Sequence, residues 1–212
     1  TAHTFAASVV NSKGKILSDR RDMYKKETGG IIPIEAANHH EQRYHTLIRE
    51  AIEKANTKKI DILAYSNAPG LPPCLKVGLK SAKEYAQDLN IPVIGVNHCI
   101  AHLSSAHFFT KAKNPIYVFV SGANTQIISL ESGRFRILGE TLDTGLGNAL
   151  DKIGRGLGMG FPAGPKIEEV AKSGTYVELP YTVKGMDLSF SGIITKAIDL
   201  YTKGASKENI CY

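Results

Sequence analysis

Apolar and polar residues follow two different spacings along the first half of the chain. Residues 5–10 and 15–24 alternate apolar with polar side chains and flank "NSKG", which predicts a β-hairpin with Gly14 in the turn. Residues 35–56 instead repeat apolar side chains three and four positions apart. This spacing predicts a long helix whose apolar face includes His40.

Four further segments continue the alternation between strand and helix. Short apolar runs at residues 60–66 and 91–96 are typical of buried strands, and each is followed by a helical pattern, at 75–89 and 98–109. Helices that alternate with buried strands predict an α/β fold with parallel strand pairing.

The pattern restarts after "KAKNP", residues 111–115. Three strands are predicted in succession, at residues 116–122, 125–132 and 134–141. A glycine-rich segment and short helices follow them.

We therefore expect an N-terminal lobe, residues 1–113, and a C-terminal lobe, residues 114–212. Each half begins with consecutive strands and then becomes helical, as a duplicated fold would. The chain opens inside a strand pattern and closes on a helix start that Ser206 could cap. We expect it to be part of a longer protein, with the second lobe incomplete.

Composition excludes several classes of protein. Hydrophobic residues make up 42% of the 212 and charged residues 22%, which is typical of a globular protein rather than a disordered one. No apolar run has membrane-spanning length and no signal peptide opens the chain, so we expect a cytoplasmic protein. Three cysteines without a CxxC motif argue against a disulfide framework. The formal charge of +6 permits a nucleic-acid partner without requiring one.

The stretch "NHCIAH" places His98 and His102 four positions apart, directly after an apolar run. On a helix, this spacing puts the two Cβ atoms roughly 6 Å apart on one face. Two imidazoles so placed can share one metal ion, although a third ligand must come from elsewhere. The alternative is that both rings are capping or core histidines bonded to the backbone, and the spacing leaves both interpretations open.

The other histidines are less informative. His39 and His40 are adjacent, so on a helix they point about 100° apart and are poorly placed to bind one metal ion together. His40 lies on the apolar face and is expected to be packed. We expect His45 and His107 to be surface or structural residues.

Small-residue loops at the ends of predicted strands indicate a phosphate-type or nucleotide ligand. The stretch "SGANT", residues 121–125, offers successive amide groups with hydroxyl and side-chain amide donors, although a plain hairpin turn is commoner. The loop at residues 67–74 leads into a helix whose N-terminus could face an anion. Asp151 could accept hydrogen bonds from a ribose, Gly164 permits close backbone approach, and Glu168 follows one helical turn later.

The chain lacks GxxxxGK[ST] and lacks GxGxxG after a strand, which argues against a P-loop enzyme and a Rossmann dehydrogenase.

A more specific match comes from several motifs taken together. In this order the chain contains "TAHT", "APGLPPCLKVG", "VNHCIAH", "VSGANTQ", "GETLD", "GNALDK", "AGPKIEE" and "ELPYTVKGMDLSFSG". Block by block, these segments resemble the universal tRNA threonylcarbamoyladenosine transferase family. The archaeal and eukaryotic form of that family is the catalytic subunit of the KEOPS complex, and its older name is O-sialoglycoprotein endopeptidase. The resemblance covers essentially the whole chain.

The resemblance implies the two-lobed α/β fold of actin, sugar kinases and heat-shock ATPases. Its lobes are ribonuclease-H-like, and the second lobe carries a helical segment specific to the family. It implies transfer of a threonylcarbamoyl group from threonylcarbamoyl-AMP to N6 of the adenosine 3′ of the anticodon, in tRNAs that read codons beginning with A. The implied partners are tRNA and KEOPS-type subunits that include a small protein kinase, with no membrane.

The resemblance also implies a site. His98 and His102 match the family's ligands for a divalent metal ion, usually described as iron or zinc, and the third ligand, an aspartate, is implied beyond Tyr212. This chain alone is therefore expected to bind metal weakly and to be inactive. The positions that match the substrate and adenine-nucleotide contacts, for threonylcarbamoyl-AMP, ATP or AMP, are Phe119, Val120, Ser121, Gly122, Ala123, Asn124, Asp151, Gly164 and Glu168.

Alanine stands where the family has glycine at Ala68, Ala123 and Ala163. A methyl group disfavours positive φ, so we expect restricted backbone approach at Ala123 and Ala163. These changes keep an alternative function open, namely a diverged nucleotide-binding scaffold subunit without catalysis. A metalloprotease is disfavoured because "HCIAH" lacks the glutamate of HExxH.

Overall fold

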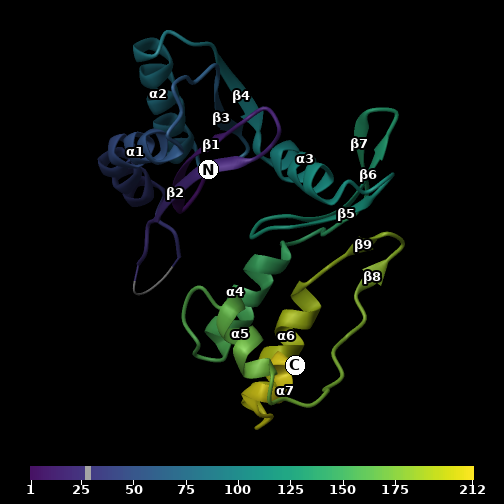
Figure 1. Ribbon diagram of the computed structural model, residues 1–212. Coiled ribbons are helices and arrows are strands. Elements are labelled where there is room, and N and C mark those ends of the chain that lie inside the picture. Colours follow the sequence, from purple (N-terminus) through teal and green to yellow (C-terminus); the bar gives the residue numbers. More distant parts are fainter. Residues whose placement is uncertain (27–29) are drawn as a thin grey trace. The chain divides into compact units, whose positions relative to one another are not determined.

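The chain forms two compact units. The computed structural model describes residues 1–26 and 30–212, and these divide into Thr1–Ala106 and His107–Tyr212 within helix α3 (His98–Thr110) (Figure 1). The lobe boundary predicted between residues 113 and 114 lies in the loop after α3 and stays a prediction.

A hairpin covered by a long helix opens the first unit. Strands β1 (Thr4–Val10) and β2 (Ile16–Met23) pair antiparallel, and Gly14 has a φ of 78°, so the predicted hairpin and its turn are confirmed. Helix α1 (Pro33–Ala55) packs against both strands. The buried positions of α1 recur every three to four residues, and they include His40 as predicted.

The second half of this unit is a parallel strand pair with helix α2 (Pro72–Asp88), which packs beside α1 (Figure 1). Strands β3 (Leu63–Ala68) and β4 (Val93–Asn97) pair in parallel, as predicted. The prediction that both strands are buried is wrong: Val93 is 39% exposed. Within residues 1–26 and 30–212 this sheet has two strands, so much of its surface faces solvent.

Three consecutive strands open the second unit, as predicted. They form an antiparallel meander of β5 (Ile116–Val120), β6 (Thr125–Glu131) and β7 (Arg134–Glu140) (Figure 1). The turn between β6 and β7 contains Ser132 and Gly133, whose φ angles are 49° and 75°. Such left-handed pairs match the twist of a tight hairpin.

Short helices make up most of the remaining chain. Helix α4 (Leu146–Gly156) packs against α5 (Gly164–Ala171) and α6 (Ser191–Thr202), and α7 (Lys207–Cys211) packs against α5 and α6. Ser206 caps α7 by accepting a hydrogen bond from the Asn209 N–H at 3.3 Å, so the predicted cap is confirmed. Between α5 and α6, two short strands, β8 (Val183–Lys184) and β9 (Asp187–Leu188), pair antiparallel.

The alternation of helices and strands confirms the α/β class. Among the helices that the structure describes, none combines the length and the apolar character that crossing a bilayer requires.

Asp143, in the loop between β7 and α4, caps helix α6 from a distance. Its two carboxylate oxygens accept hydrogen bonds from the amides of Phe190 (3.0 Å) and Ser191 (2.7 Å), where α6 begins. Burial alone raises the pKa of this carboxylate, but the hydrogen bonds from Ser191, Phe190 and Thr144 outweigh burial and hold the pKa well below its ordinary value of 3.8. The ionised carboxylate thus joins two segments of the second unit.

Replacing Asp143 by alanine is expected to destabilise the protein by about 1 kcal/mol, as loss of a helix cap does. Because folding lowers the pKa of this carboxylate, its contribution is fully present above about pH 4 and is lost as pH falls further toward the folded pKa. Urea unfolding at pH 7 and at pH 3 measures both effects. Asp199→Ala, which removes a carboxylate from surface ion pairs on α6, is the control. An equal loss of unfolding free energy in both variants would contradict the conclusion that Asp143 caps α6.

Candidate functional site

His98 owes its position to a strand that runs directly into a helix. Strand β4 ends at Asn97 and α3 begins at His98. The Asn97 side-chain oxygen accepts hydrogen bonds from the amides of Cys99 (3.0 Å) and Ile100 (3.1 Å), as an N-cap does. The first turn of α3 therefore starts at the carboxyl end of a parallel strand, where α/β proteins build their sites.

The two histidines of α3 are arranged as two ligands of one metal ion would be. Nε2 of His98 lies 3.3 Å from Nε2 of His102, and the rings meet edge to face at 80°. Two nitrogen ligands at the usual zinc distance, in tetrahedral geometry, stand about 3.3 Å apart. Burial lowers the pKa of His98, and His102 lowers it further, so the ring is neutral at pH 7 and able to coordinate.

The pair fits a metal ion but does not make a complete site. Within residues 1–26 and 30–212, no group of three or more His, Cys, Asp or Glu side chains is placed to hold a metal ion. The geometry is compatible with the metal-ligand interpretation of the pair, but that interpretation and the identity of a third ligand both stay predictions.

The loop between β3 and α2 lies beside this pair, because Ala68 is the strand partner of Asn97. Helix α2 begins with Pro72 and Pro73, which have no amide hydrogen, so its N-terminus offers fewer donors to an anion than we expected. The Leu71 N–H is also taken, since it donates to the carbonyl of Thr1 at 2.7 Å.

The loop after β5 closes on itself and leaves two amides available. The Ser121 N–H donates to the Asn124 carbonyl at 2.8 Å, and the Asn124 N–H donates to the Ser121 hydroxyl at 3.0 Å. In the part of the chain that the structure describes, the exposed amides of Gly122 and Ala123 make no hydrogen bond to protein. Successive free amides of this kind suit a phosphate or carboxylate oxygen.

The start of helix α4 packs against the Ser121–Asn124 loop and donates hydrogen bonds to it. The Gly147 N–H donates to the Ser121 carbonyl at 3.1 Å. A Cβ at Gly145 would lie 2.5 Å from the carbonyl carbon of Ala123, and one at Gly147 would lie 2.9 Å from Cα of Gly122. The loop and the helix can approach this closely because both positions are glycine. The positive end of the helix dipole consequently points at the loop.

Helices α4 and α5 bring the predicted adenosine contacts near one another. The Ala163 N–H donates to a carboxylate oxygen of Asp151 at 2.8 Å, which ties the start of α5 to α4. Gly164 begins α5, and Glu168 lies one turn later with its side chain exposed. Phe119, by contrast, is a buried residue of strand β5. The ligand roles of these residues stay predictions.

The alanines that replace family glycines cause no conflict with backbone conformation. Among the described residues, those with positive φ do not include Ala68, Ala123 or Ala163. The expected restriction of close backbone approach at Ala123 and Ala163 stays a prediction. Ala163 has a φ of −91° and is fully buried. A Cβ at Gly154 would lie 2.2 Å from the Ala163 methyl group, which therefore fills the contact between α4 and α5.

Comparison with known proteins matches this chain to a family over most of its length. The model of the family described as TsaD, tRNA N6-adenosine threonylcarbamoyltransferase, matches residues 15–212. The chain belongs to this family. A relative from Thermococcus sibiricus, named tRNA N6-adenosine threonylcarbamoyltransferase, is 49% identical over 216 residues, which cover 100% of this chain and 66% of that protein.

A second relative is longer still. The probable bifunctional tRNA threonylcarbamoyladenosine biosynthesis protein of Methanocaldococcus jannaschii is 45% identical and covers 100% of this chain, which spans 40% of its length. Among solved structures, HypF of T. kodakarensis shares the fold, with a TM-score of 0.52 at 15% identity over 79% of this chain and 33% of that one.

Replacing His102 by alanine in the full-length protein is expected to reduce bound metal about tenfold, because a ligand is lost. Elemental analysis of the purified protein measures the metal content. His107→Ala, a change on the same helix, is the control and should leave the metal content unchanged. A normal metal content in His102→Ala would show that the pair does not bind the metal ion.

Replacing Gly147 by alanine is expected to displace the Ser121–Asn124 loop, because the new methyl group would lie 2.9 Å from Cα of Gly122, closer than a Cβ can approach. AMP affinity, measured by calorimetry, should fall about tenfold or more, since a small misplacement of oriented groups is costly. Gly192→Ala, at the start of α6, is the matched control, since its Cβ would have an ordinary contact at 3.4 Å. Wild-type AMP affinity in Gly147→Ala would show that the loop does not bind the nucleotide.

Proposed function

We propose that the full-length protein transfers a threonylcarbamoyl group from threonylcarbamoyl-AMP to N6 of the adenosine 3′ of the anticodon, in tRNAs that read codons beginning with A. Family membership over residues 15–212 is the observation that carries this proposal. The convergent geometry of His98 and His102, and the free amides after β5, support it.

The proposed reaction is an acyl transfer. The lone pair of N6 attacks the carbamoyl carbon, a new C–N bond forms, and the C–O bond to the adenylate phosphate breaks. AMP leaves with the bonding electrons, and N6 loses one proton. An exocyclic adenine amine is a weak nucleophile, so positioning of donor and acceptor has to supply much of the rate.

The residues divide into two groups by the chemistry they offer. His98 and His102 would provide two nitrogen ligands to a divalent metal ion, iron or zinc, which supplies Lewis-acid polarisation of donor oxygens when bound. The amides of Gly122 and Ala123 would donate hydrogen bonds to the phosphate or to the developing negative charge. The remaining proposed contacts to donor and adenosine are Phe119, Val120, Ser121, Asn124, Asp151, Gly164 and Glu168.

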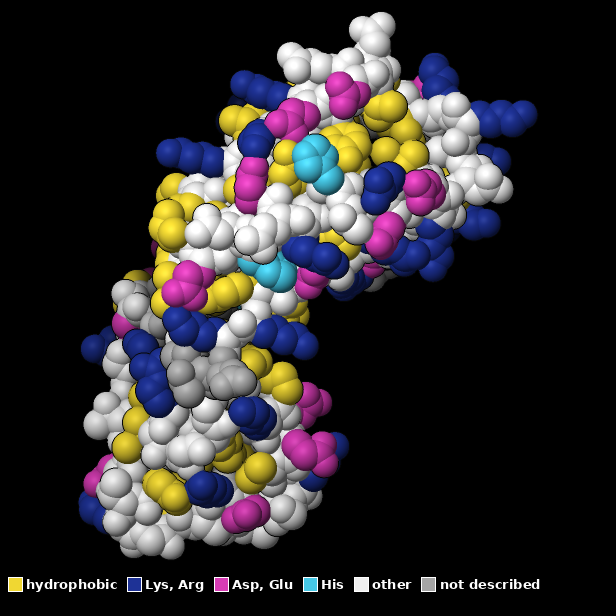
Figure 2. Space-filling model, turned by 90° about the vertical axis from the view of Figure 1, so that its left-hand side faces the viewer, with side chains coloured by type: hydrophobic (Ala, Val, Ile, Leu, Met, Phe, Trp, Pro, Cys, Tyr) yellow, Lys and Arg dark blue, Asp and Glu magenta, His cyan; other side chains and the backbone are white. Residues whose placement is uncertain are grey.

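The partners proposed are tRNA and KEOPS-type subunits, including a small protein kinase, in the cytoplasm. The word bifunctional in the names of several relatives supports a second activity linked to this one in those proteins. Figure 2 shows Lys and Arg side chains spread over the face in view, with acidic side chains between them. On the face in view, contact with a tRNA backbone would use separate basic side chains rather than one basic patch.

Transfer itself is the decisive experiment. The full-length protein, with candidate partner subunits, is given threonylcarbamoyl-AMP labelled in the threonine and a tRNA transcript that reads a codon beginning with A. We expect label in the tRNA, and none in a matched transcript with guanosine at the position 3′ of the anticodon. His98→Ala should abolish most of the label, and His107→Ala should not.

Two results would contradict the proposal. Label in the guanosine transcript would show that N6 of that adenosine is not the acceptor. A folded protein that binds AMP but transfers no label would favour a nucleotide-binding scaffold without catalysis.

A further inference from the structure

Three hydrogen bonds hold the segment that precedes β1. The Leu71 N–H donates to the carbonyl of Thr1, and the Tyr24 N–H donates to the carbonyl of His3, each at 2.7 Å. The third bond comes from a side chain: Nε2 of His40 lies 2.7 Å from the carbonyl oxygen of Ala2. Three consecutive carbonyls are therefore bonded to three separate segments of the first unit: the loop before α2, the end of β2 and helix α1.

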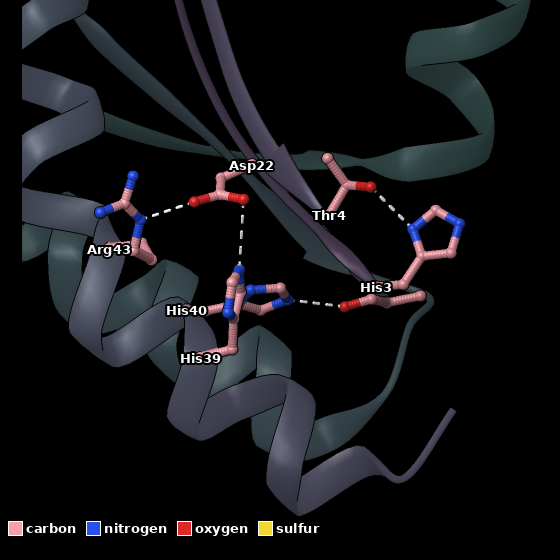
Figure 3. Close-up of polar contacts among 7 residues, drawn as sticks. His3, Thr4, Asp22, His39, His40 and Arg43 are labelled. Carbon is pink, nitrogen blue, oxygen red and sulfur yellow. Dashed lines mark hydrogen bonds and ion pairs between the residues drawn. The ribbon is translucent and has the colours of Figure 1, made fainter. Parts of the chain in front are cut away.

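His40 is a polar, titratable residue on the buried face of helix α1. It points from the buried face of α1 toward the start of β1 (Figure 3) and is 1% exposed. A carbonyl oxygen only accepts, so Nε2 carries the proton, and burial lowers the pKa of His40 and keeps the ring neutral. Nδ1 is buried without a hydrogen-bond partner in the described residues. Burying Nδ1 without a partner costs free energy that an apolar side chain would not cost. The hydrogen bond to the Ala2 carbonyl is the contact that an apolar side chain could not make.

The neighbouring histidine, His39, contacts Asp22 instead of the Thr1–His3 segment. His39 lies 3.5 Å from Asp22, which also accepts from Arg43 at 2.5 Å, so this group links α1 to β2 (Figure 3). His39 makes no bond to the Thr1–His3 segment among the contacts of the described residues. It is therefore a matched comparison for His40.

The Thr1–His3 segment lies at the same strand ends as the histidine pair. A Cβ at Gly70 would be 2.7 Å from the Thr1 carbonyl oxygen, so the segment touches the loop after β3. Ala68, two residues earlier, pairs with Asn97, and His98 follows Asn97 directly. A ligand held by the pair at these strand ends would have the segment as a neighbour.

We propose that His40 is a positioning residue: the bond from its Nε2–H to the carbonyl of Ala2 fixes the Thr1–His3 segment at the strand ends that carry His98. The catalytic part of this inference rests on the proposed function. The positional part rests on the three hydrogen bonds alone and can be tested without any activity.

The test compares His40→Gln, His40→Phe and His39→Gln in the full-length protein. Glutamine can place an N–H where Nε2 of histidine lies, whereas phenylalanine fills the space without a donor. Amide hydrogen exchange at Leu71 and Tyr24 reports on the segment directly. In His40→Phe we expect both amides to exchange about tenfold faster, because one of three bonds is lost. His40→Gln and His39→Gln should exchange as the wild type does.

The kinetic readout separates positioning from general destabilisation. In His40→Phe, KM for threonylcarbamoyl-AMP should rise about tenfold while tRNA affinity stays within about twofold. His40→Gln should restore KM. If the wild type transfers no label, the proposed function fails, and the exchange measurement still decides the positional inference.

Three outcomes would overturn the inference. The first is unchanged exchange at Leu71 and Tyr24 in His40→Phe. The second is faster exchange in His40→Gln, which also decides the matter if His40→Phe does not fold. The third is a rise in donor KM accompanied by an equal loss of tRNA affinity, or equal effects in His39→Gln. Either result would indicate that His40 supports folding only.

Discussion

The parallel pairing of β3 with β4 is the constraint on which the first unit depends. Parallel strands run in one direction, so whatever follows them emerges at the same edge. Because Ala68 lies opposite Asn97, the rigid Pro/Gly loop and the start of α3 emerge together. This register places the loop after β3, and the Thr1–His3 segment bonded to it, at the same sheet edge as the histidine pair. A shift of the pairing would move the loop away from the pair.

In the second unit, contact between a turn and a helix, rather than strand register, positions the candidate site residues. Its strand β5 pairs antiparallel with β6, and the loop between them is a tight, self-bonded turn. Two glycines at the start of α4 let that helix press against the turn, and helix amides satisfy the turn's carbonyls. The amides that remain free then face outward, which is the arrangement an anion requires. Here the decisive factor is backbone proximity rather than side-chain identity.

Local periodicity was sufficient to predict most of the elements. The hairpin at Gly14, the long helix with His40 inside it and the β5–β7 meander each follow from spacing within one segment. Burial of β4 could not be predicted in this way, because it depends on which neighbours cover the strand. The bonds from Asp143 to α6 and from His40 to Ala2 join residues 47 and 38 positions apart, and no local pattern marks them. Spacing placed His98 and His102 on one face, but only the geometry showed that their nitrogens converge.

The contact between Gly154 and Ala163 limits which residues these two positions can carry. The two positions, on α4 and at the start of α5, together have room for one methyl group. In this chain the methyl belongs to residue 163, and residue 154 is thereby confined to glycine. Alanine at both positions would force α4 and α5 apart and stretch the hydrogen bond that ties Asp151 to the start of α5.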